Sequence, residues 1–403
     1  MSFSELSNRL NKELSKEERS TNGIFFTPKL ARTALFNRLD LLGVKPNTIL
    51  EPSCGSGEFI NDCLIKYPTA LVTGIEKHKV IFENLSGSEL YLNNTKKLRL
   101  INSDFLGFNE SKYDLIIGNP PYFITKDKNS ACMNGRGNIF VQFIYKCLTE
   151  NLKPNGILAF VLPTSFYNCS YYSPCREYIS KNTSLLHVEN IDASYYETTQ
   201  DTMIMIVKNT KPTNKDYIFE RNNNVYITPF YERLNELVID TKTISELGFR
   251  VKTGEVVWNQ HKEKLVDSQG TQAQSTPIIY PQNIVDNKLV LNNLKVDKKN
   301  EKKQYINDEY SSTPTTGPAI LISRGFGNKY NFIYTTIEDS CFSFYGENHI
   351  NVVYPLDKSI DNCGAFDKIK RSLKDIRTNE FIKLFVGNGA LSKTELENVL
   401  PIF

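Results

Sequence analysis

The sequence predicts an α/β fold built on a mostly parallel β-sheet, followed by a second domain of α+β character. Between residues 49 and 207, short apolar runs such as "YDLIIGNPP" and "GILAFVLP" alternate with stretches of helical spacing such as "NIFVQFIYKCLTENL". This alternation is typical of a parallel sheet with helices on both faces, which binds ligands at the carboxyl ends of its strands. After residue 207 the sequence becomes polar and turn-rich, with short β-like runs. We therefore expect a first domain over residues 1–240 and a second over 241–403.

The composition is that of a soluble globular protein without a strong charge bias. The 403 residues include 48 Lys and Arg and 45 Asp and Glu, which gives a formal net charge of +3. A charge this small neither requires nor excludes a polyanionic partner, so contacts with nucleic acid would have to come from local patches. The eight cysteines form no Cys-x-x-Cys pair and there are only four histidines, so we expect no metal site.

The N-terminal segment "MSFSELSNRLNKELSKEERS" is charged and has helical spacing, unlike the apolar segment of an export signal. No window of the sequence approaches roughly eighteen consecutive apolar residues, the length that a membrane-spanning helix needs. We therefore expect an intracellular, cytoplasmic protein without a signal peptide or a membrane segment. We also expect a monomer.

The segment "ILEPSCGSGEFI" carries a glycine-rich turn between the first predicted strand and a helix. Gly55 and Gly57 allow the backbone to turn tightly and to approach a ligand closely. The dinucleotide-binding fingerprint Gly-x-Gly-x-x-Gly would need glycine at position 60, where the sequence has Ile60. Glu51 and Pro52 precede the turn, and this arrangement suits a cofactor that has an ammonium group and no phosphate.

The next two predicted strands also end in polar residues. Glu76 in "GIEKH" follows the turn by about twenty residues, and a carboxylate at that spacing can accept both hydroxyls of a ribose. Asp104 in "NSDF" can accept a hydrogen bond from an adenine amino group, while Phe105 lies against the ring. Three polar strand ends in this order predict one site for a cofactor with these groups.

The fourth predicted strand ends in "NPPY". Residues before proline are pushed to extended conformations, and Pro120 and Pro121 have no N–H groups. The local polar groups are therefore acceptors, namely the side-chain oxygen of Asn119 and the carbonyl of Pro120. An aromatic amine is a poor nucleophile because its lone pair is delocalised, and two acceptors on its hydrogens would turn that lone pair towards a methyl donor. Tyr122 supplies a stacking face for the base.

These motifs resemble those of the class I S-adenosylmethionine-dependent methyltransferases, in particular the γ class of adenine-N6 DNA methyltransferases, the group of the Taq enzyme. The resemblance is carried, in order, by "GIFFTP" (23–28), "EPSCGSG" (51–57), "GIE" (74–76), "SDF" (103–105) and "NPPY" (119–122). It spans residues 23–207, whereas residues 245–403 match only in placement and size. It implies a Rossmann-like sheet of seven mostly parallel strands, S-adenosylmethionine as the cofactor and a C-terminal target-recognition domain.

Carried over residue by residue, the resemblance implies two groups of site residues. Besides Gly55, Gly57 and Phe105, contacts with the cofactor would come from Thr27, Glu51, Pro52, Ser53, Cys54, Glu76, Asp104 and Pro121. The target adenine would be held by Asn119, Pro120 and Tyr122. A second aromatic residue, Tyr196 or alternatively Tyr195, would face Tyr122 across the flipped base.

The partner implied by the resemblance is double-stranded DNA that contains a short specific site. Adenine would leave the duplex before methylation, because the amine cannot reach a buried donor while it is stacked. A separately encoded restriction endonuclease would share this specificity. In the second domain, "VKTGEVVWNQHK" and "ISRGFGNKYN" bring basic residues beside aromatics, so Lys252 and Arg324 are candidates for DNA contacts. Residues 126–138 form a candidate loop that could close on DNA or cofactor.

Two other functions remain open. Methyltransferases of an rRNA base amine or of a protein glutamine amide use the same Asn-Pro-Pro-Tyr corner, although a second domain of about 160 residues favours DNA. A non-catalytic DNA-binding subunit is the other alternative, but such a chain would have no need for Asn119, Glu76 and Asp104.

Overall fold

The chain forms two compact units, Met1–Tyr231 and Glu232–Phe403. This boundary lies earlier than the expected one at residue 240. The computed structural model describes residues 3–126, 129–135, 137–191, 201–267, 275–294, 302–307, 310, 312–325, 332–357, 363–386 and 391–403.

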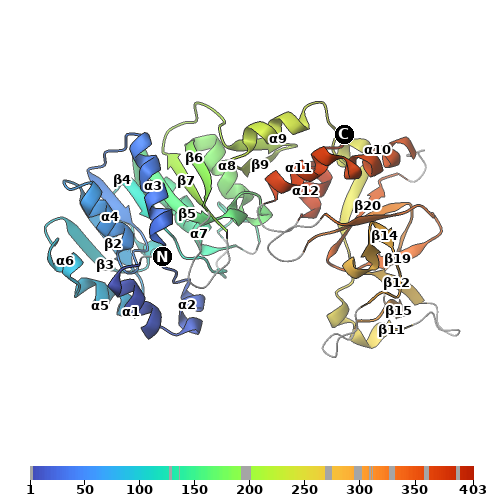
Figure 1. Ribbon diagram of the computed structural model, residues 1–403, viewed down its shortest axis with the longest axis horizontal. Coiled ribbons are helices and arrows are strands. Elements are labelled where there is room, and N and C mark those ends of the chain that lie inside the picture. The colour runs from blue at the N-terminus through green and yellow to red at the C-terminus, as the bar shows by residue number, and fades with distance from the viewer. Residues whose placement is uncertain are drawn as a thin grey trace. The chain divides into compact units, whose positions relative to one another are not determined.

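The first unit is built on a seven-stranded sheet in the order β3-β2-β1-β4-β5-β7-β6 (Figure 1). All neighbouring strands are parallel except β7, which is antiparallel to both β5 and β6. The prediction of a mostly parallel sheet is therefore confirmed. The strands are β1 (Thr48–Glu51), β2 (Leu71–Glu76), β3 (Leu98–Asn102), β4 (Tyr113–Gly118), β5 (Leu152–Pro163), β6 (Ser184–Ile191) and β7 (Thr202–Lys208).

The central strands of this sheet are buried on both faces. In β5, Leu158 and Phe160 join a hydrophobic cluster on one face, and Ala159 and Val161 join a separate cluster on the other. Helix α7 contributes Phe140 to the first cluster, while α3 and α4 cover the second. Burial on both faces explains why these strands read as continuous apolar runs in the sequence.

The helices of this unit are α1 (Glu5–Glu13), α2 (Lys16–Asn22), α3 (Lys29–Leu41), α4 (Glu58–Lys66), α5 (Lys79–Ser86), α6 (Glu89–Leu92), α7 (Ile139–Lys146) and α8 (Ser173–Asn182), with short turns η1 (Phe105–Gly107), η2 (Cys147–Asn151), η3 (Thr164–Phe166) and η4 (Ser170–Tyr172).

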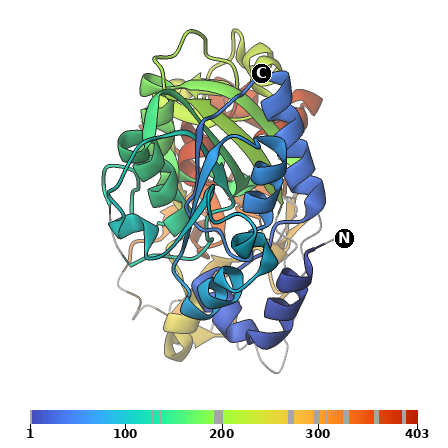
Figure 2. The ribbon, with the colours of Figure 1, turned by 90° about the vertical axis from the view of Figure 1, so that its left-hand side faces the viewer.

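Helix α1 packs beside α5 (Figure 2), and Glu18 of α2 lies 3.0 Å from His78, which directly precedes α5. Leu10 and Leu14 form a hydrophobic cluster with Ile81 of α5. Ser4 caps α1 and Ser15 caps α2, each accepting a backbone N–H in the first turn of its helix. The expected helical N-terminus is therefore confirmed, and it reaches the end of the sheet where the glycine-rich turn lies.

A β-hairpin completes the first unit. Strands β8 (Ile218–Arg221) and β9 (Asn224–Ile227) pair antiparallel. Its turn, in the region after residue 207 that was expected to be polar and turn-rich, is formed by Asn222 and Asn223, which have φ angles of 46° and 61°. Asparagine tolerates these left-handed angles, which a two-residue hairpin turn requires.

The second unit has the expected α+β character. One sheet has the order β10-β20-β17-β18 and is antiparallel throughout, and another has the order β11-β15-β12-β19-β16 with β12 and β19 parallel. Its strands are β10 (Phe249–Thr253), β11 (Leu265–Val266), β12 (Ser275–Ile279), β13 (Ile284–Val285), β14 (Lys288–Leu289), β15 (Tyr305–Asn307), β16 (Thr315–Thr316), β17 (Ala319–Ser323), β18 (Tyr334–Ile337), β19 (Ser343–Gly346) and β20 (Ile350–Pro355). The helices are α9 (Tyr231–Val238), which begins at the boundary, α10 (Cys363–Lys374), α11 (Ile376–Phe385) and α12 (Lys393–Asn398), with short turns η5 (Ser245–Leu247), η6 (Trp258–Gln260), η7 (Lys262–Lys264) and η8 (Pro281–Asn283).

Within the described ranges, none of the helices combines the length and the apolar content that a membrane crossing requires. The same residues contain no group of three or more His, Cys, Asp or Glu side chains placed to hold a metal ion.

Candidate active site

A cavity of about 320 Å³ lies at the carboxyl ends of the central strands of the first unit. Open α/β sheets bind ligands at this edge, where the chain order reverses, which here is between β1 and β4. The cavity is lined by eight of the predicted residues: Pro52, Ser53, Gly55, Glu76, Asp104, Phe105, Asn119 and Pro121. The structure therefore brings together residues from four separate motifs. The remaining described site residues of the first unit, which do not line the cavity, are Thr27, Glu51, Cys54, Gly57, Pro120 and Tyr122.

The glycine-rich turn is joined to β2 by one backbone hydrogen bond and closed on itself by another. The Cys54 N–H donates to the Ile75 carbonyl over 2.9 Å, and the Gly57 N–H donates to the Cys54 carbonyl over 2.8 Å. Gly57 has a φ of +81°, and a Cβ there would lie 2.8 Å from a methyl of Leu85. Position 57 therefore requires glycine. The Cys54 side chain is buried, and burial raises the pKa of its thiol well above the ordinary value.

Glu51 is a buried carboxylate with an unused acceptor. Its side chain is 3% exposed, and its Oε2 has no hydrogen-bond partner in the part of the chain that the structure describes. Burial, together with the nearby charge of Glu76, raises the pKa of the Glu51 carboxyl well above its usual range. Buried polar atoms without partners are rare in folded proteins because they are costly. This atom therefore fits a ligand that brings a hydrogen-bond donor or a positive charge.

Glu76 has both carboxylate oxygens fixed by backbone donors. Oε2 accepts from Gly55 N–H over 2.9 Å and Oε1 accepts from His78 N–H over 2.7 Å. Burial raises the pKa of this carboxyl, and the two backbone hydrogen bonds oppose that shift. Each oxygen keeps a second lone pair, so the oriented carboxylate can accept two further donors from a ligand in the cavity.

Asp104 and Phe105 lie just beyond the end of β3. Asp104 Oδ1 caps the following turn by accepting from Leu106 N–H over 3.0 Å, and its Oδ2 lies 2.8 Å from Lys77 Nζ. Phe105 is 1% exposed and packs against Phe143 with ring centroids 4.9 Å apart. Asp104 therefore presents a partly exposed, already oriented acceptor, and Phe105 forms part of the apolar wall beside it.

The Asn-Pro-Pro-Tyr corner contains a tight set of side-chain hydrogen bonds. Asn119 Nδ2 donates to Thr27 Oγ1 over 3.0 Å, and Asn119 Oδ1 accepts from the Tyr122 hydroxyl. The same hydroxyl lies 2.9 Å from the Val161 carbonyl of β5. Tyr122 also meets the edge of the Phe140 ring, with centroids 5.8 Å apart. The corner thus fixes the Asn119 amide in one orientation and occupies its oxygen with a donor from its own chain.

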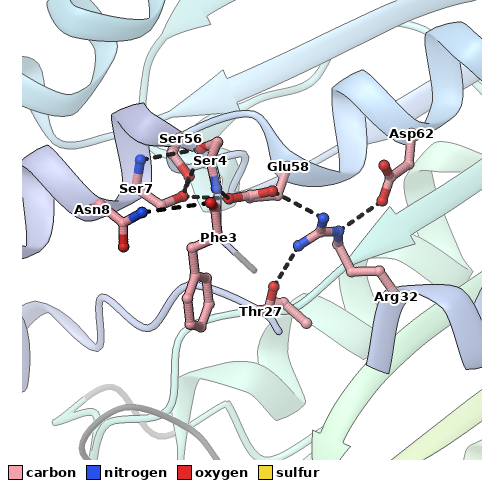
Figure 3. Close-up of polar contacts among 9 residues, drawn as sticks. All are labelled: Phe3, Ser4, Ser7, Asn8, Thr27, Arg32, Ser56, Glu58 and Asp62. Carbon is pink, nitrogen blue, oxygen red and sulfur yellow. Dashed lines mark hydrogen bonds and ion pairs between the residues drawn. The ribbon is translucent and has the colours of Figure 1, made fainter. Parts of the chain in front are cut away.

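A buried arginine lies beside Thr27 (Figure 3). Arg32 is 5% exposed and donates to the Thr27 carbonyl over 2.6 Å. Its other nitrogens contact Glu58 Oε2 at 3.0 Å and Asp62 Oδ2 at 2.7 Å, both on α4. This residue was not among those predicted from the sequence.

The residues that line the cavity without having been predicted include Phe26, Lys77 and His78. Lys77 contacts the predicted acceptor Asp104, and His78 Nε2 lies 3.0 Å from Glu18 Oε1 on α2. Lys77 and His78 directly follow Glu76 in "GIEKH". Their position next to a carboxylate at the end of a strand could have identified them as residues of the site.

The other candidates belong to the second unit or fall outside the described residues. Tyr195 and Tyr196 fall within residues 192–200, which the structure does not describe. In the second unit, Lys252 Nζ lies 3.5 Å from Glu255 Oε1, and Arg324 Nη1 donates to the Asn348 carbonyl over 3.1 Å. Both cations therefore have partners within their own unit.

The sheet and its polar edge define a class of protein. The strand order places the antiparallel β7 between β5 and β6, and an acidic residue stands at or just beyond the ends of β1, β2 and β3. This is the Rossmann-like architecture of a class I S-adenosylmethionine-dependent methyltransferase, and S-adenosylmethionine is accordingly the cofactor.

Comparison with known proteins identifies the family. The chain is 32% identical to type II methyltransferase M.CvrRI of Paramecium bursaria Chlorella virus XZ-6E, over 100% of this chain and 99% of that protein. It is 30% identical to modification methylase CviBIII of Paramecium bursaria Chlorella virus NC1A, with the same coverage. Residues 66–196 match the Eco57I restriction-modification methylase family. Among solved structures it is similar to TrmN from Thermus thermophilus, with 17% identity over 44% of this chain and 48% of that one and a TM-score of 0.31.

The chain belongs to the type II methyltransferases of restriction–modification systems. It is therefore a DNA methyltransferase, and the expected resemblance to this group is confirmed.

Proposed function

We propose that the protein transfers a methyl group to the exocyclic N6 amine of adenine at a short specific site in duplex DNA. The observation that carries this proposal is the Asn119 corner at the end of β4, beside the cofactor cavity. The amide of Asn119 is oriented by Thr27, and the following prolines leave carbonyl and amide oxygens as the local acceptors. Such a set fits the two hydrogens of an amino group.

The cofactor residues divide by the group they would bind. Glu51 would hold the ammonium group, since its buried oxygen has no other partner among the described residues. Glu76 would accept the ribose hydroxyls and Asp104 the adenine amine, with Phe105 beside the ring. The remaining backbone and side-chain contacts would come from Thr27, Pro52, Ser53, Cys54, Gly55, Gly57 and Pro121.

S-adenosylmethionine supplies an electrophilic methyl group on a sulfonium sulfur. The protein's part is to prepare the nucleophile: Asn119 Oδ1 and the Pro120 carbonyl would accept the two amine hydrogens, so that the nitrogen becomes pyramidal and its lone pair is less delocalised into the ring. The cofactor residues named above would hold S-adenosylmethionine, which would supply the methyl with its sulfur as the leaving group, and the extra proton on the amine nitrogen would pass to solvent. Positioning and fixed dipoles suffice, and no strongly basic residue is needed.

Tyr122 would change partners when the base enters. In the free protein its hydroxyl donates to Asn119 Oδ1, the atom that the amine needs. When the target binds, an amine hydrogen would replace the Tyr122 hydroxyl as the donor to Asn119 Oδ1, so that this oxygen always has a partner. The Tyr122 ring would then stack on the extruded base. The aromatic residue on the opposite face would be Tyr196, or alternatively Tyr195.

The second unit would read the DNA sequence. We assign target recognition to residues 232–403, with Lys252 and Arg324 as candidate contacts, and methylation by the first unit. On binding DNA, Lys252 would exchange its ion pair with Glu255, and Arg324 its contact with the Asn348 carbonyl, for contacts with phosphates or bases. A separately encoded endonuclease that cuts the same site, and from which methylation protects the DNA, is part of the proposal.

A product analysis tests the proposal directly. Purified protein is incubated with labelled S-adenosylmethionine and, separately, duplex DNA, rRNA and cell protein, and the DNA is digested to nucleosides for mass spectrometry. We expect label in DNA as N6-methyladenine. N4-methylcytosine would overturn the base assignment, and label in rRNA or protein alone would overturn the substrate. Binding of DNA without transfer, restored by a second subunit, would indicate a non-catalytic partner.

A further inference from the structure

Arg32 joins three parts of the first unit through one buried guanidinium group (Figure 3). It reaches the Thr27 carbonyl before α3, Glu58 at the start of α4 and Asp62 one turn further along α4. These three contacts, at 2.6, 3.0 and 2.7 Å, are made by three different nitrogens of the planar guanidinium group. Lysine carries the same charge but has a single nitrogen, so it cannot make these three contacts together.

Glu58 continues the connection to the N-terminal helix. Its Oε1 accepts from the backbone N–H of Ser4 over 2.8 Å and from the Ser7 hydroxyl. Ser7 Oγ also lies 2.7 Å from Ser56 Oγ, in the middle of the glycine-rich turn. Ser7 is 1% exposed and Ser56 is 4% exposed, so these contacts are shielded from water. The start of α1 is therefore fastened, through Ser4 and Ser7, to Glu58 at the start of α4 and, through Ser7, to Ser56 of the glycine-rich turn.

The same connection ends at the proposed catalytic corner. Thr27 accepts from Arg32 with its carbonyl oxygen and from Asn119 with its hydroxyl oxygen. A continuous path of polar contacts thus runs from Ser7 and Ser56 through Glu58, Arg32 and Thr27 to Asn119.

We infer that Arg32 and Glu58 are positioning residues for methyl transfer. They hold the glycine-rich turn, which would contact the cofactor, and the Asn119 amide, which would contact the target amine, at a fixed separation. The N-terminal helix is consequently part of the cofactor site, although none of its residues lines the cavity. This inference rests on the proposed function, because it takes the cavity as the cofactor site and Asn119 as the acceptor.

A purely stabilising role accounts less well for this arrangement. Removing two charges from water is expensive, and a buried ion pair often adds no stability over apolar residues of the same volume. Here the Arg32–Glu58 pair also makes hydrogen bonds that connect it to the glycine-rich turn and to the Asn119 corner. A displacement of about 1 Å between reacting groups lowers catalytic rates by roughly 100-fold, so an arrangement that prevents it has a large effect on transfer.

The test compares Arg32→Lys with the matched control Arg38→Lys. Arg38 lies on the same helix and forms an ion pair with Glu189 at 2.9 Å, without contact with the turn. Binding of S-adenosylhomocysteine to the full-length protein is measured by calorimetry without DNA, well below the melting temperature of each variant. We expect Arg32→Lys to weaken binding by roughly tenfold or more, as for a lost charged hydrogen bond, and Arg38→Lys to leave it unchanged.

Single-turnover methylation of DNA at saturating cofactor supplies the second readout. Arg32→Lys should lower this rate well beyond the loss in Arg38→Lys, because the Asn119 corner is displaced even when the cofactor is bound. Equal cofactor affinity and equal rate in the two variants would overturn the inference. Failure of the unaltered protein to bind S-adenosylhomocysteine would instead overturn the proposed cofactor site.

Ser7→Ala gives a milder variant if Arg32→Lys does not fold. It removes the hydroxyl that reaches Ser56 and Glu58. Ser86→Ala, at the end of α5, is its control, since Ser86 Oγ donates to the Glu83 carbonyl of its own helix. We expect a severalfold loss of S-adenosylhomocysteine affinity for Ser7→Ala and none for Ser86→Ala. Unchanged affinity in Ser7→Ala would contradict the role assigned to the N-terminal helix.

Discussion

Asn119 and Thr27, which are 92 residues apart in the sequence, are joined by a hydrogen bond of 3.0 Å between Nδ2 and Oγ1. This contact decides which end of the Asn119 amide is free to meet a ligand. Because Nδ2 is committed to Thr27, Oδ1 faces the Tyr122 hydroxyl, which a target amine could replace. The segment that precedes the glycine-rich turn therefore sets the orientation of the residue that follows β4.

Replacing Asn119 by Ala should lower the methylation rate by roughly two to three orders of magnitude, the usual cost of removing one preorganised hydrogen-bonding group at a reacting centre. Cofactor affinity should change little, because the Glu51, Glu76 and Asp104 side chains are unaltered. Single-turnover methylation and S-adenosylhomocysteine binding measure the two effects. Asn182→Ala, on α8, is a control, and an unchanged rate in Asn119→Ala would remove the amine-holding role.

Replacing Thr27 by Val should reduce the rate about tenfold, since the isosteric side chain cannot accept from Asn119 and the amide loses its orientation. Thr27→Ser keeps an oxygen at this position and should retain most of the activity. Comparing these two variants separates the effect of the lost hydrogen bond from the effect of altered packing. If Val and Ser behaved alike in single-turnover assays, the orientation of Asn119 would not depend on Thr27.

Replacing Tyr122 by Ala should weaken base extrusion by roughly 1–3 kcal/mol, the value of one stacking contact. A 2-aminopurine at the target position should therefore gain less fluorescence on binding. Tyr122→Phe keeps the ring and removes the hydroxyl that occupies Asn119, so it should preserve the fluorescence gain. A full signal with Tyr122→Ala would mean that the ring does not hold the extruded base.

Glu51 should make the cofactor-free protein less stable as the pH rises. Burial, followed by the charge of Glu76, raises the pKa of this carboxyl well above the ordinary value. Between the unfolded and the folded pKa, the folded chain holds the proton that the unfolded chain has released, so the free energy of unfolding falls with increasing pH. Glu51→Gln should reduce this slope, as measured by urea unfolding at several pH values without cofactor.

Cofactor binding should show the opposite dependence on pH. An ammonium group favours the ionised form of Glu51, so S-adenosylhomocysteine should bind more tightly as the pH rises towards the folded pKa. The dependence should be weaker in Glu51→Gln, and the affinity lower. Identical pH profiles for the two proteins would show that Glu51 does not contact the ammonium group.

Removing the second unit should abolish sequence preference. A chain that ends at Val238 would lose all of the second unit except α9 and would keep the whole seven-stranded sheet and its cavity. We expect it to bind S-adenosylhomocysteine but to lose selective methylation, as mapped by sequencing of the modified DNA. Selective methylation by a shortened chain that retains cofactor binding would contradict the assignment of target recognition to residues 232–403.

The sheet was predictable because its strands are short, apolar and buried on both faces. The strand-end residues Glu76, Asp104 and Asn119 were placed correctly at one edge, since parallel strands present their carboxyl ends together. The hairpin β8–β9 was missed because "RNNNV" has the composition of an irregular loop. The left-handed backbone angles of Asn222 and Asn223, which make it a tight hairpin turn, are visible only in the structure.

Arg32 and the Tyr122 hydroxyl contact could not be read from local patterns. Arg32 stands in a helix whose sequence looks like any amphipathic surface helix, and its three partners come from two other segments. Likewise, the motif "NPPY" predicts a stacking ring but gives no information on which oxygen the hydroxyl meets. Both features depend on the tertiary packing of segments far apart in the chain.

The buried state of Cys54 has a practical consequence for thiol labelling. A thiol whose pKa is raised by burial stays neutral near neutral pH, and neutral thiols react slowly with maleimides and iodoacetamides. Among the described cysteines, Cys341 of the second unit is the exposed one. A fluorescent dye should therefore attach at Cys341 and spare the glycine-rich turn, which offers an optical signal for DNA binding that leaves methyl transfer intact.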